Sequence, residues 1–297
     1  MAEERGTERT AAAKPSLCPI CCASAGFSRR TPLIADGHIF VCAECSGYFL
    51  FPPTAVVYEN SGWTAMRRRE WLRDRDRGEQ YAAAIAEWYA RWTGDDLRSV
   101  LEIGCGTGYM GVGFEALGVR YSGIEVDPAS VSFARGQGLE VEELPVEALS
   151  ASALASRSFD LVLSSNVLEH VDRPMCAFQE IRRATRRLAV TVVPNPEGLL
   201  PRLKANRAFL RVAQRFWASD RVIAYSIDGF WHNIAYSRQT LAYLAAHAGL
   251  DIKSLRSIGI NDPVFGFVQP NASLLYRGVA ALGRMLDMDS QLLLVAE

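Results

Sequence analysis

Residues 101–110, LEIGCGTGYM, decide the fold of this chain. A short apolar run leads into glycines at positions 104, 106 and 108, which alternate with small or polar residues. A glycine-rich loop between a strand and a helix lets the backbone approach a bound nucleotide. The stretch therefore predicts a strand–loop–helix unit of a nucleotide-binding α/β fold, and it leaves open which nucleotide is bound.

Strand and helix patterns alternate on the C-terminal side of this loop. They predict a parallel sheet covered by helices on both faces, with ligands at the carboxyl ends of the strands. A basic, aromatic insertion interrupts the alternation and is expected to cap the substrate. Strands are expected over 97–104, 120–127, 139–144, 158–166, 187–196, 251–260 and 291–297, helices over 109–118, 128–138, 173–186, 237–250 and 272–286, and the cap over 197–231.

Two C-x-x-C pairs precede this region. They are CPIC, with Cys18 and Cys21, and CAEC, with Cys42 and Cys45. In a reducing compartment such pairs favour a metal over disulfides, and four thiolates suit tetrahedral zinc. We predict a structural zinc ribbon, closed by a hairpin between the pairs, in which Cys22 could replace Cys21. A rubredoxin-like iron site and a metal-free, redox-active head are the alternatives.

A helical pattern joins this head to the glycine loop. Residues 64–92 contain no proline and one glycine. Tyr81, Ile85, Trp88 and Trp92 recur there at helical spacing. One or two helices are therefore expected to lead into the main domain.

The register of the glycines distinguishes two classes of nucleotide. Gly106, Gly108 and Gly111 satisfy G-x-G-x-x-G, the dinucleotide pattern. However, the strand ends near Ile103, so the tight turn falls at Gly104. The loop glycines are then those at 104, 106 and 108, which is the wrong register for a dinucleotide.

Two acids stand at the carboxyl ends of the first two strands. Glu102 can neutralise an ammonium group, and it would repel a pyrophosphate. Glu125 comes 21 residues after Gly104 and can accept hydrogen bonds from both ribose hydroxyls. Together the two acids favour a ligand with a ribose and a cationic tail, such as S-adenosylmethionine (SAM), over NAD.

Three motifs resemble those of a known family. VLEIGCGTG, GIEVDP and FDLVLSSNVLEHVDRP resemble the first, second and fourth motifs of class I SAM-dependent methyltransferases. The resemblance covers about 97–297 and implies a seven-stranded, mostly parallel Rossmann-like sheet whose last strand is antiparallel. The four-cysteine head is similar to the one that precedes some bacterial small-molecule methyltransferases, including sugar C-methyltransferases.

The resemblance also implies roles for single residues. The three loop glycines would lie against the methionine part of the cofactor, with Glu102 facing its amino group and Glu125 its ribose. Asn166, just past the fourth strand, would lie near the reacting methyl group. In the third motif, LPVEAL, Glu147 aligns with the acidic position, whereas Pro145 stands where an aspartate is usual.

Two histidines are candidates for the general base. His170 follows Glu169 in NVLEHV, a stretch that resembles ubiquinone-pathway O-methyltransferases. In those enzymes a Glu-x-x-Glu-His pattern is associated with a divalent metal, but Asn166 replaces the first acid here, which argues against a metal. His232, in GFWHNIAYS, would act from the substrate cap. A packing or capping role is the structural alternative for both.

Composition limits the partners. The chain has 297 residues and a net charge of −1, so no overall field attracts it to nucleic acid or to an anionic membrane. No apolar stretch reaches the roughly 18 residues that span a bilayer, and the N-terminus lacks an apolar signal core. A cytoplasmic protein is expected, without membrane contact and with a small-molecule substrate.

The sequence thus predicts a methyltransferase that binds SAM and structural Zn²⁺. It would methylate a small acceptor, acidic or carrier-bound, at oxygen in a natural-product or sugar pathway. The alternatives are C- or N-methylation of a sugar or carrier-bound substrate, RNA base methylation, and a cofactor-binding partner subunit without turnover. The expected parts are a disordered tail (1–15), the zinc ribbon (16–58), a helical connector (59–96) and the methyltransferase domain (97–297).

Overall fold

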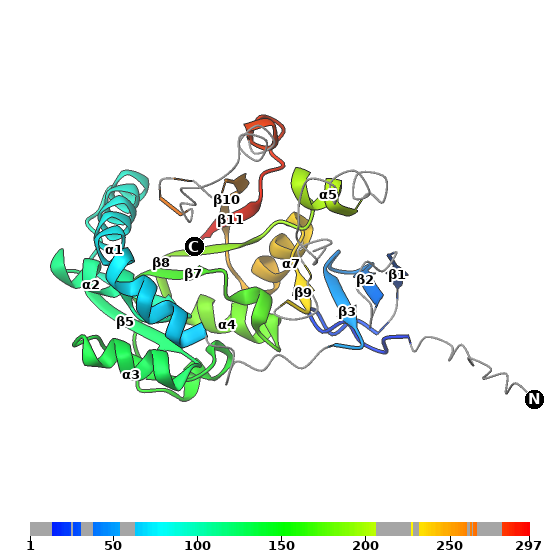
Figure 1. Cartoon of the computed structure of the whole chain (residues 1–297). Coiled ribbons are helices and arrows are strands. Elements are labelled where there is room, and N and C mark those ends of the chain that lie inside the picture. The colour runs from blue at the N-terminus through cyan, green and yellow to red at the C-terminus, as the bar shows by residue number, and fades with distance from the viewer. Residues whose placement is uncertain are drawn as a thin grey trace, which may run out of the picture.

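The computed structural model shows a central sheet flanked by helices, with a small second sheet at one end (Figure 1). It describes residues 14–24, 26–30, 38–53, 63–205, 227, 232–259, 262, 264–265 and 281–297. The expected disordered tail lies almost wholly outside the described residues. Among the described helices, none is both long and apolar enough to cross a membrane.

The central sheet has seven strands in the order β10-β11-β8-β7-β4-β5-β6. The strands from β8 to β6 in this order are all parallel, whereas β11 runs antiparallel to both β8 and β10. This confirms the expected mostly parallel sheet with an antiparallel last strand. Its strands are β4 (Ser99–Ile103), β5 (Arg120–Glu125), β6 (Val141–Glu143), β7 (Phe159–Ser165), β8 (Thr185–Pro194), β10 (Ile252–Ile258) and β11 (Gln291–Ala296).

Helices cover both faces of this sheet, as Figure 1 shows. Each face has its own hydrophobic core. In each core, the buried residues of the helices on that face pack against the strand residues that point to it. On the first face lie α1 (Trp63–Thr93), α2 (Tyr109–Ala116) and α3 (Pro128–Gly136), and on the second lie α4 (Pro174–Ala184) and α7 (Arg238–Ala248).

The two cores follow from the period of two along each strand. In β11, Leu293 and Val295 belong to the first core, whereas Leu292 and Leu294 belong to the second. All four side chains are at most 2% exposed. Continuous apolar strands therefore predict a sheet that is buried on both faces, because every position has a helix to pack against.

The second sheet contains the cysteine pairs. Strands β1 (Phe27–Arg29), β2 (His38–Cys42) and β3 (Tyr48–Phe51) form an antiparallel meander. A fourth strand, β9 (Ile234–Ala235), pairs with β3 although it comes from the far end of the chain. The hairpin was predicted from sequence, but the pairing with β9 was not.

The head shares its core with the main sheet. Ile20, Phe40 and Phe49 of the head belong to the same buried cluster as Leu241 and Leu244 of α7. Tyr48 also donates a hydrogen bond to Glu197, 3.1 Å away. The head is therefore packed on the second face of the sheet and is not an appendage on a linker.

Most local predictions are confirmed. Residues 64–92 form one continuous helix, α1, rather than two. Within it Ile85 is 1% exposed, but Trp92 is 44% exposed and lies outside the core. Ser237 caps α7 through a reciprocal capping box with Thr240, and Gly249 ends the helix in the left-handed conformation, as expected.

The substrate-cap prediction falls largely outside the described residues. Within 197–231, only residues 197–205, which include α5 (Leu199–Ala205), and Ile227 are described. Of the helix predicted over 272–286, residues 281–286 are described; 281–285 are helical and 286 is in a turn. Two short 3-10 helices near the carboxyl edge of the sheet, η1 (Val146–Ala151) and η2 (Leu168–His170), complete the description.

Candidate functional site

The carboxyl ends of β4, β5 and β7 meet at one edge of the sheet. Ile103 at the end of β4 pairs with Ile124 on one side and with Ser164 on the other. Parallel pairing in this register sets the residues that follow each strand side by side. We call this edge the rim, and it contains the glycine loop, Glu102, Glu125 and Asn166.

All three loop glycines have left-handed backbone conformations. The φ angles of Gly104, Gly106 and Gly108 are 68°, 54° and 76°. A Cβ on Gly104 would lie 2.3 Å from the Val167 side chain, and one on Gly108 would lie 2.4 Å from Leu139. A Cβ on Gly106 would meet nothing within 4 Å. Gly106 thus faces open space at the rim, while its two neighbours are packed.

Gly111 has a different role from the loop glycines. It lies inside α2, where a Cβ would come within 2.5 Å of the Tyr121 ring. It allows helix and strand to approach and does not line the loop. This agrees with the register argument against a dinucleotide pattern.

Glu125 fixes the glycine loop through hydrogen bonds to its backbone and to the residues that follow β5. Its two carboxylate oxygens accept hydrogen bonds from three backbone N–H groups, those of Gly106 (2.8 Å), Val126 (2.7 Å) and Asp127 (3.0 Å). A carboxylate has about four acceptor positions, so capacity for a further donor remains. Glu125 is half-buried, and the side chain of Val126 beside it is 48% exposed.

Glu102 is buried on the first face of the sheet. The Tyr121 hydroxyl donates a hydrogen bond to its Oε2 atom at 2.6 Å. Burial raises the pKa of Glu102 to about 8, against which the Tyr121 hydrogen bond acts, and the nearby Glu125 charge raises it further. A cation beside this carboxyl would reverse the shift, because it stabilises the charged form.

Asn166 sits at the turn after β7 in a left-handed conformation, with a φ of 53°. Its amide oxygen accepts a hydrogen bond from Gln291 at 3.0 Å, and its backbone N–H donates to Val192 at 2.8 Å. Gln291 opens β11 and fixes the orientation of Asn166 from the antiparallel strand. Sequence reasoning did not identify Gln291, because nothing local links it to the rim.

Glu147 lies in η1, which follows β6 in the chain. Its Oε1 atom accepts a hydrogen bond from the backbone N–H of Arg173 at 3.1 Å. This bond ties the third-motif segment to the start of α4. The structure thus brings Glu147 to the helix on the second face, where it has a structural partner.

The two candidate histidines lie against each other. The ring centroids of His170, from η2, and His232, just before β9, are 4.8 Å apart. Glu169 is adjacent, and the ligand atoms of the three residues lie within 4.8 Å of one another. Glu169 is 2% exposed, and burial raises its pKa to about 8. Sequence reasoning found both histidines separately but not their contact, and it gave Glu169 no role.

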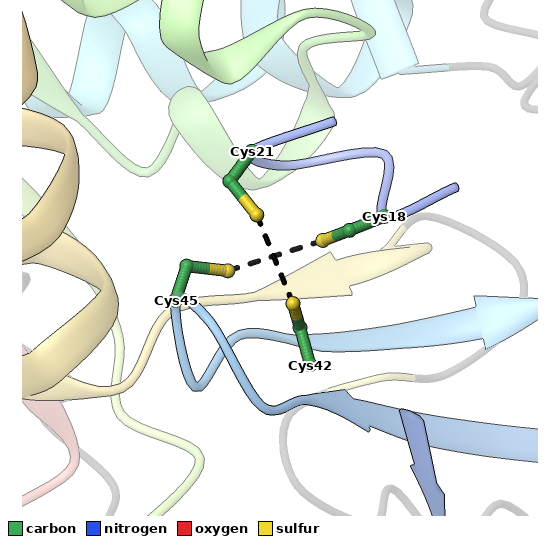
Figure 2. A group of neighbouring side chains, drawn as sticks. All are labelled: Cys18, Cys21, Cys42 and Cys45. Atoms are coloured by element: carbon green, nitrogen blue, oxygen red, sulfur yellow. Dashed lines mark hydrogen bonds between the residues drawn. The ribbon is translucent and has the colours of Figure 1, made fainter. Parts of the chain in front are cut away.

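The four cysteines of the head point toward a common centre (Figure 2). The Sγ atoms of Cys18 and Cys45 are 3.9 Å apart, and those of Cys21 and Cys42 are 3.7 Å apart. A tetrahedron of thiolates around zinc has edges of about 3.8 Å, whereas a disulfide bond is about 2.05 Å long. The cluster therefore has the dimensions of a tetrahedral metal site, and no disulfide joins any of its members.

The two cysteine pairs are built alike. Cys18 donates a backbone hydrogen bond to the residue five positions later, and so does Cys42. Cys22 and Ser46, which follow the second cysteine of each pair, both have left-handed backbones. Cys22 is exposed and is not part of the cluster, so Cys21 is the fourth member. The hydrogen bond between Cys18 and Cys45 lowers the pKa of Cys18 to about 6 and raises that of Cys45, so the thiolate of this pair is at Cys18, and burial raises the pKa of Cys21.

Part of the chain is similar to known methyltransferase sequences. Residues 101–193 match the family model described as a methyltransferase domain. An uncharacterized methyltransferase of Mycobacteroides abscessus is 39% identical over 93 residues, which are 30% of this chain and 36% of that protein. One of Mycobacterium avium is 37% identical over 130 residues, 40% of this chain and 51% of that protein. The chain thus matches about half, or less, of the length of these relatives.

Solved structures share the fold. A chain of the complex that contains the Haloferax volcanii Trm112 methyltransferase activator has a TM-score of 0.53 and 17% identity, and the match covers 82% of this chain and 98% of that one. The plantazolicin methyltransferase BpumL, solved in complex with SAH, has a TM-score of 0.52 and 11% identity, with 81% and 91% covered. At these identities the likeness shows the fold.

Proposed function

We propose that this chain, whose residues 101–193 form a class I SAM-dependent methyltransferase domain, transfers the methyl group of SAM to an oxygen of a small-molecule acceptor. The observation that carries the proposal is the rim. Gly106 is open there, its N–H donates to the ribose-binding candidate Glu125, and the second acid, Glu102, does not suit a diphosphate. When bound, SAM supplies an activated methyl group on its sulfonium. The residues of the chain bind and orient the cofactor and the acceptor, and they remove the acceptor's proton.

In this proposal the two acids bind different parts of the cofactor. Glu102 accepts a hydrogen bond from the ammonium group of the methionine part, and Glu125 accepts the ribose hydroxyls. The free acceptor capacity of Glu125 supports the ribose assignment, as does its hold on the Gly106 N–H. The exposed Val126 side chain offers an apolar surface for the adenine. Glu147, Gly104 and Gly108 shape the loops around the ligand.

The acceptor lies beyond the methyl end, at Asn166 and the histidine pair. An oxygen nucleophile must lose a proton as the O–CH₃ bond forms and the S–CH₃ bond breaks. Either His170 or His232 can accept that proton, since neutral imidazole is the usual base near pH 7. The contact between the two rings supports a shared position at the acceptor. We propose a small acceptor, acidic or carrier-bound; C- or N-methylation of a sugar or carrier-bound substrate is the nearest alternative.

The four-cysteine cluster has a structural role in this proposal. It holds Zn²⁺ with Cys18, Cys21, Cys42 and Cys45, and the closed set of four thiolates leaves no position for a substrate. Its distances and paired turns support zinc over a disulfide. Zinc would hold β2 and β3 in place, and with them β9 and the segment of His232. Free thiols also support a reducing, cytoplasmic location.

Parallel calorimetric titrations with SAM and NAD test the proposal. SAM is expected to bind at one site, and NAD to give no heat. Glu125→Ala should weaken SAM binding by about 1.5–3 kcal/mol, the scale of hydrogen bonds to a charged group. Glu143→Ala, which removes an exposed carboxylate at the end of β6, serves as the matched control and should bind SAM normally. Tight binding of NAD alone would overturn the choice of cofactor.

Turnover separates an enzyme from a cofactor-binding partner subunit. The purified protein with SAM and a panel of hydroxylated small molecules should release S-adenosylhomocysteine. RNA should not serve as acceptor, and the protein should show no salt-sensitive affinity for RNA. Normal SAM binding with no turnover on any acceptor class would favour the partner-subunit alternative.

A further inference from the structure

Glu169, His170 and His232 form a group of metal-ligating side chains, of which the proposed function uses only the two histidines, as alternative proton acceptors. Their ligand atoms lie within 4.8 Å of one another, and they come from η2 and from the segment before β9. In a tetrahedral zinc site with nitrogen and oxygen ligands the corresponding spacing is about 3.3 Å. The ligand atoms would therefore have to move closer together by up to about 1.5 Å to hold a tetrahedral ion.

The Glu169 carboxyl is buried without a partner. It is 2% exposed, and neither of its oxygens accepts a hydrogen bond from another described residue. A buried carboxylate costs several kcal/mol unless a cation or hydrogen-bond donors compensate it. Both of its neighbours in the group are imidazoles, which coordinate metals in their neutral form. A cation bound by all three residues would satisfy the carboxyl.

The surrounding structure fixes the group. The Tyr236 hydroxyl, fully buried, donates a hydrogen bond to the carbonyl of Leu168 in η2. The backbone N–H of Leu50 in the head donates to the carbonyl of Asn233 at 2.8 Å. The two segments that carry the ligands are thus held by the same strand, β9, and its pairing with β3.

We propose that Glu169, His170 and His232 bind a divalent transition metal ion at the acceptor side of the rim. Two imidazoles and one carboxylate are the ligands of catalytic zinc sites and of the open iron(II) sites. Such a donor set selects Zn²⁺ and its first-row neighbours over Mg²⁺ and Ca²⁺, which take oxygen ligands. Asn166 is not a ligand, because it is bound by Gln291. His232, from a distant segment, supplies the third ligand instead.

The three protein ligands leave a position open, unlike the four cysteines of the head. The role of this position rests on the proposed function. An acceptor hydroxyl bound there would lose its proton to water at neutral pH, because the ion lowers its pKa. The oxygen then attacks the methyl carbon, the O–CH₃ bond forms, and the S–CH₃ bond breaks. With the ion bound, the two imidazoles act as its ligands, and water takes over from them the role of proton acceptor in the proposed function.

Cobalt substitution tests the site independently of turnover. Metal-free protein reloaded with Co²⁺ should bind about two equivalents, one per site. The cysteine site gives thiolate-to-cobalt charge-transfer bands, and the second site gives only ligand-field bands. Glu169→Gln and His232→Ala should each lose one equivalent while the charge-transfer bands persist. His247→Ala, which removes an exposed imidazole on α7, should still bind two.

The controls keep the outcomes distinct. Circular dichroism and melting temperature verify that each variant is folded; if Glu169→Gln is not, the half-buried His232→Ala decides. A single equivalent in the wild type, or two in both variants, would overturn the metal site. Titration of the same samples with SAM separates this from the proposed function. One equivalent of Co²⁺ with normal SAM binding would overturn only the metal site at Glu169, His170 and His232. Two equivalents of Co²⁺ without SAM binding would overturn only the proposed function.

Discussion

The head and the rim both gather ligating side chains on turns with left-handed residues, yet they are built differently. In the head, two turns with the same hydrogen-bond pattern present four cysteines at the spacing of a tetrahedron. At the rim, the loop glycines, two acids and the group around Glu169 come from several strand ends, and part of their hydrogen-bonding capacity is unused.

This difference separates structural from chemical roles. The cysteine cluster is closed, so a metal there can only stabilise the fold. The rim is open at Gly106 and carries a buried carboxyl without a partner at Glu169. The two regions are nevertheless connected, because β3 of the head pairs with β9, which follows His232. A change in the head is therefore expected to affect the fold first and the rim through β9.

Cys42→Ser should have the largest effect of the changes considered for the two regions. Cys42 is 1% exposed and belongs to both the cysteine cluster and the shared core. Loss of a structural metal belongs to the class of changes that cost more than about 4 kcal/mol. Chemical denaturation should show this loss for the whole chain, together with one fewer zinc by elemental analysis.

Cys22→Ser is the matched control for that prediction. Cys22 is exposed and does not belong to the cluster, so its replacement should stay within about 0.5 kcal/mol of wild type. Equal metal content and stability in Cys42→Ser and wild type would contradict the structural role of the head.

Two glycine substitutions compare packed and open positions within the rim. Gly104→Ala should destabilise the fold by about 3 kcal/mol, because it combines a positive φ with a 2.3 Å contact to Val167. Gly106→Ala meets no atom within 4 Å and should cost about 1 kcal/mol from backbone strain alone. Thermal unfolding measures both.

The order of these effects should reverse in cofactor binding. A methyl group at position 106 occupies the open side of the loop. Gly106→Ala should therefore lose more of the free energy of SAM binding than of the free energy of unfolding. If SAM bound to Gly106→Ala as tightly as to wild type, the open face of the loop would not be the binding face.

Glu102 gives the effect that depends on pH. With a pKa of about 8 in the free protein, its carboxyl is mostly protonated at pH 7. An ammonium group bound beside it lowers that pKa, so SAM binding should release close to one proton at pH 7, and the affinity should rise between about pH 6 and 7.5. Calorimetry in two buffers of different ionisation enthalpy counts the proton.

Glu102→Gln sharpens this prediction. The amide keeps an acceptor for the Tyr121 hydroxyl but carries no charge, so proton release should disappear and the affinity near pH 7.5 should fall by about 1.5 kcal/mol. Proton release that persists in this variant would have to come from another group, and the assignment of Glu102 to the ammonium would be wrong.

Local patterns predicted the parts of the molecule that depend on neighbouring residues. The strand–glycine–helix order, the cap at Ser237 and the paired cysteines are all properties of short segments, and the structure has each of them. The register of the loop could also be predicted, because it depends only on where β4 ends.

Contacts between distant segments could not be predicted in this way. The Tyr121 hydroxyl on Glu102 depends on the pairing of β4 with β5, and the contact of His232 with His170 depends on the pairing of β9 with β3. A two-residue strand such as β9 has no periodicity of its own. It forms because β3 offers an edge and because the shared core holds both segments together.

A crystal structure with S-adenosylhomocysteine bound tests the central claim most directly. The amino group of the ligand is expected within hydrogen-bond distance of Glu102, the ribose hydroxyls on Glu125, and the ligand over Gly106. A rim that stays empty at saturating ligand, or that takes up a diphosphate between the two acids, would contradict that claim.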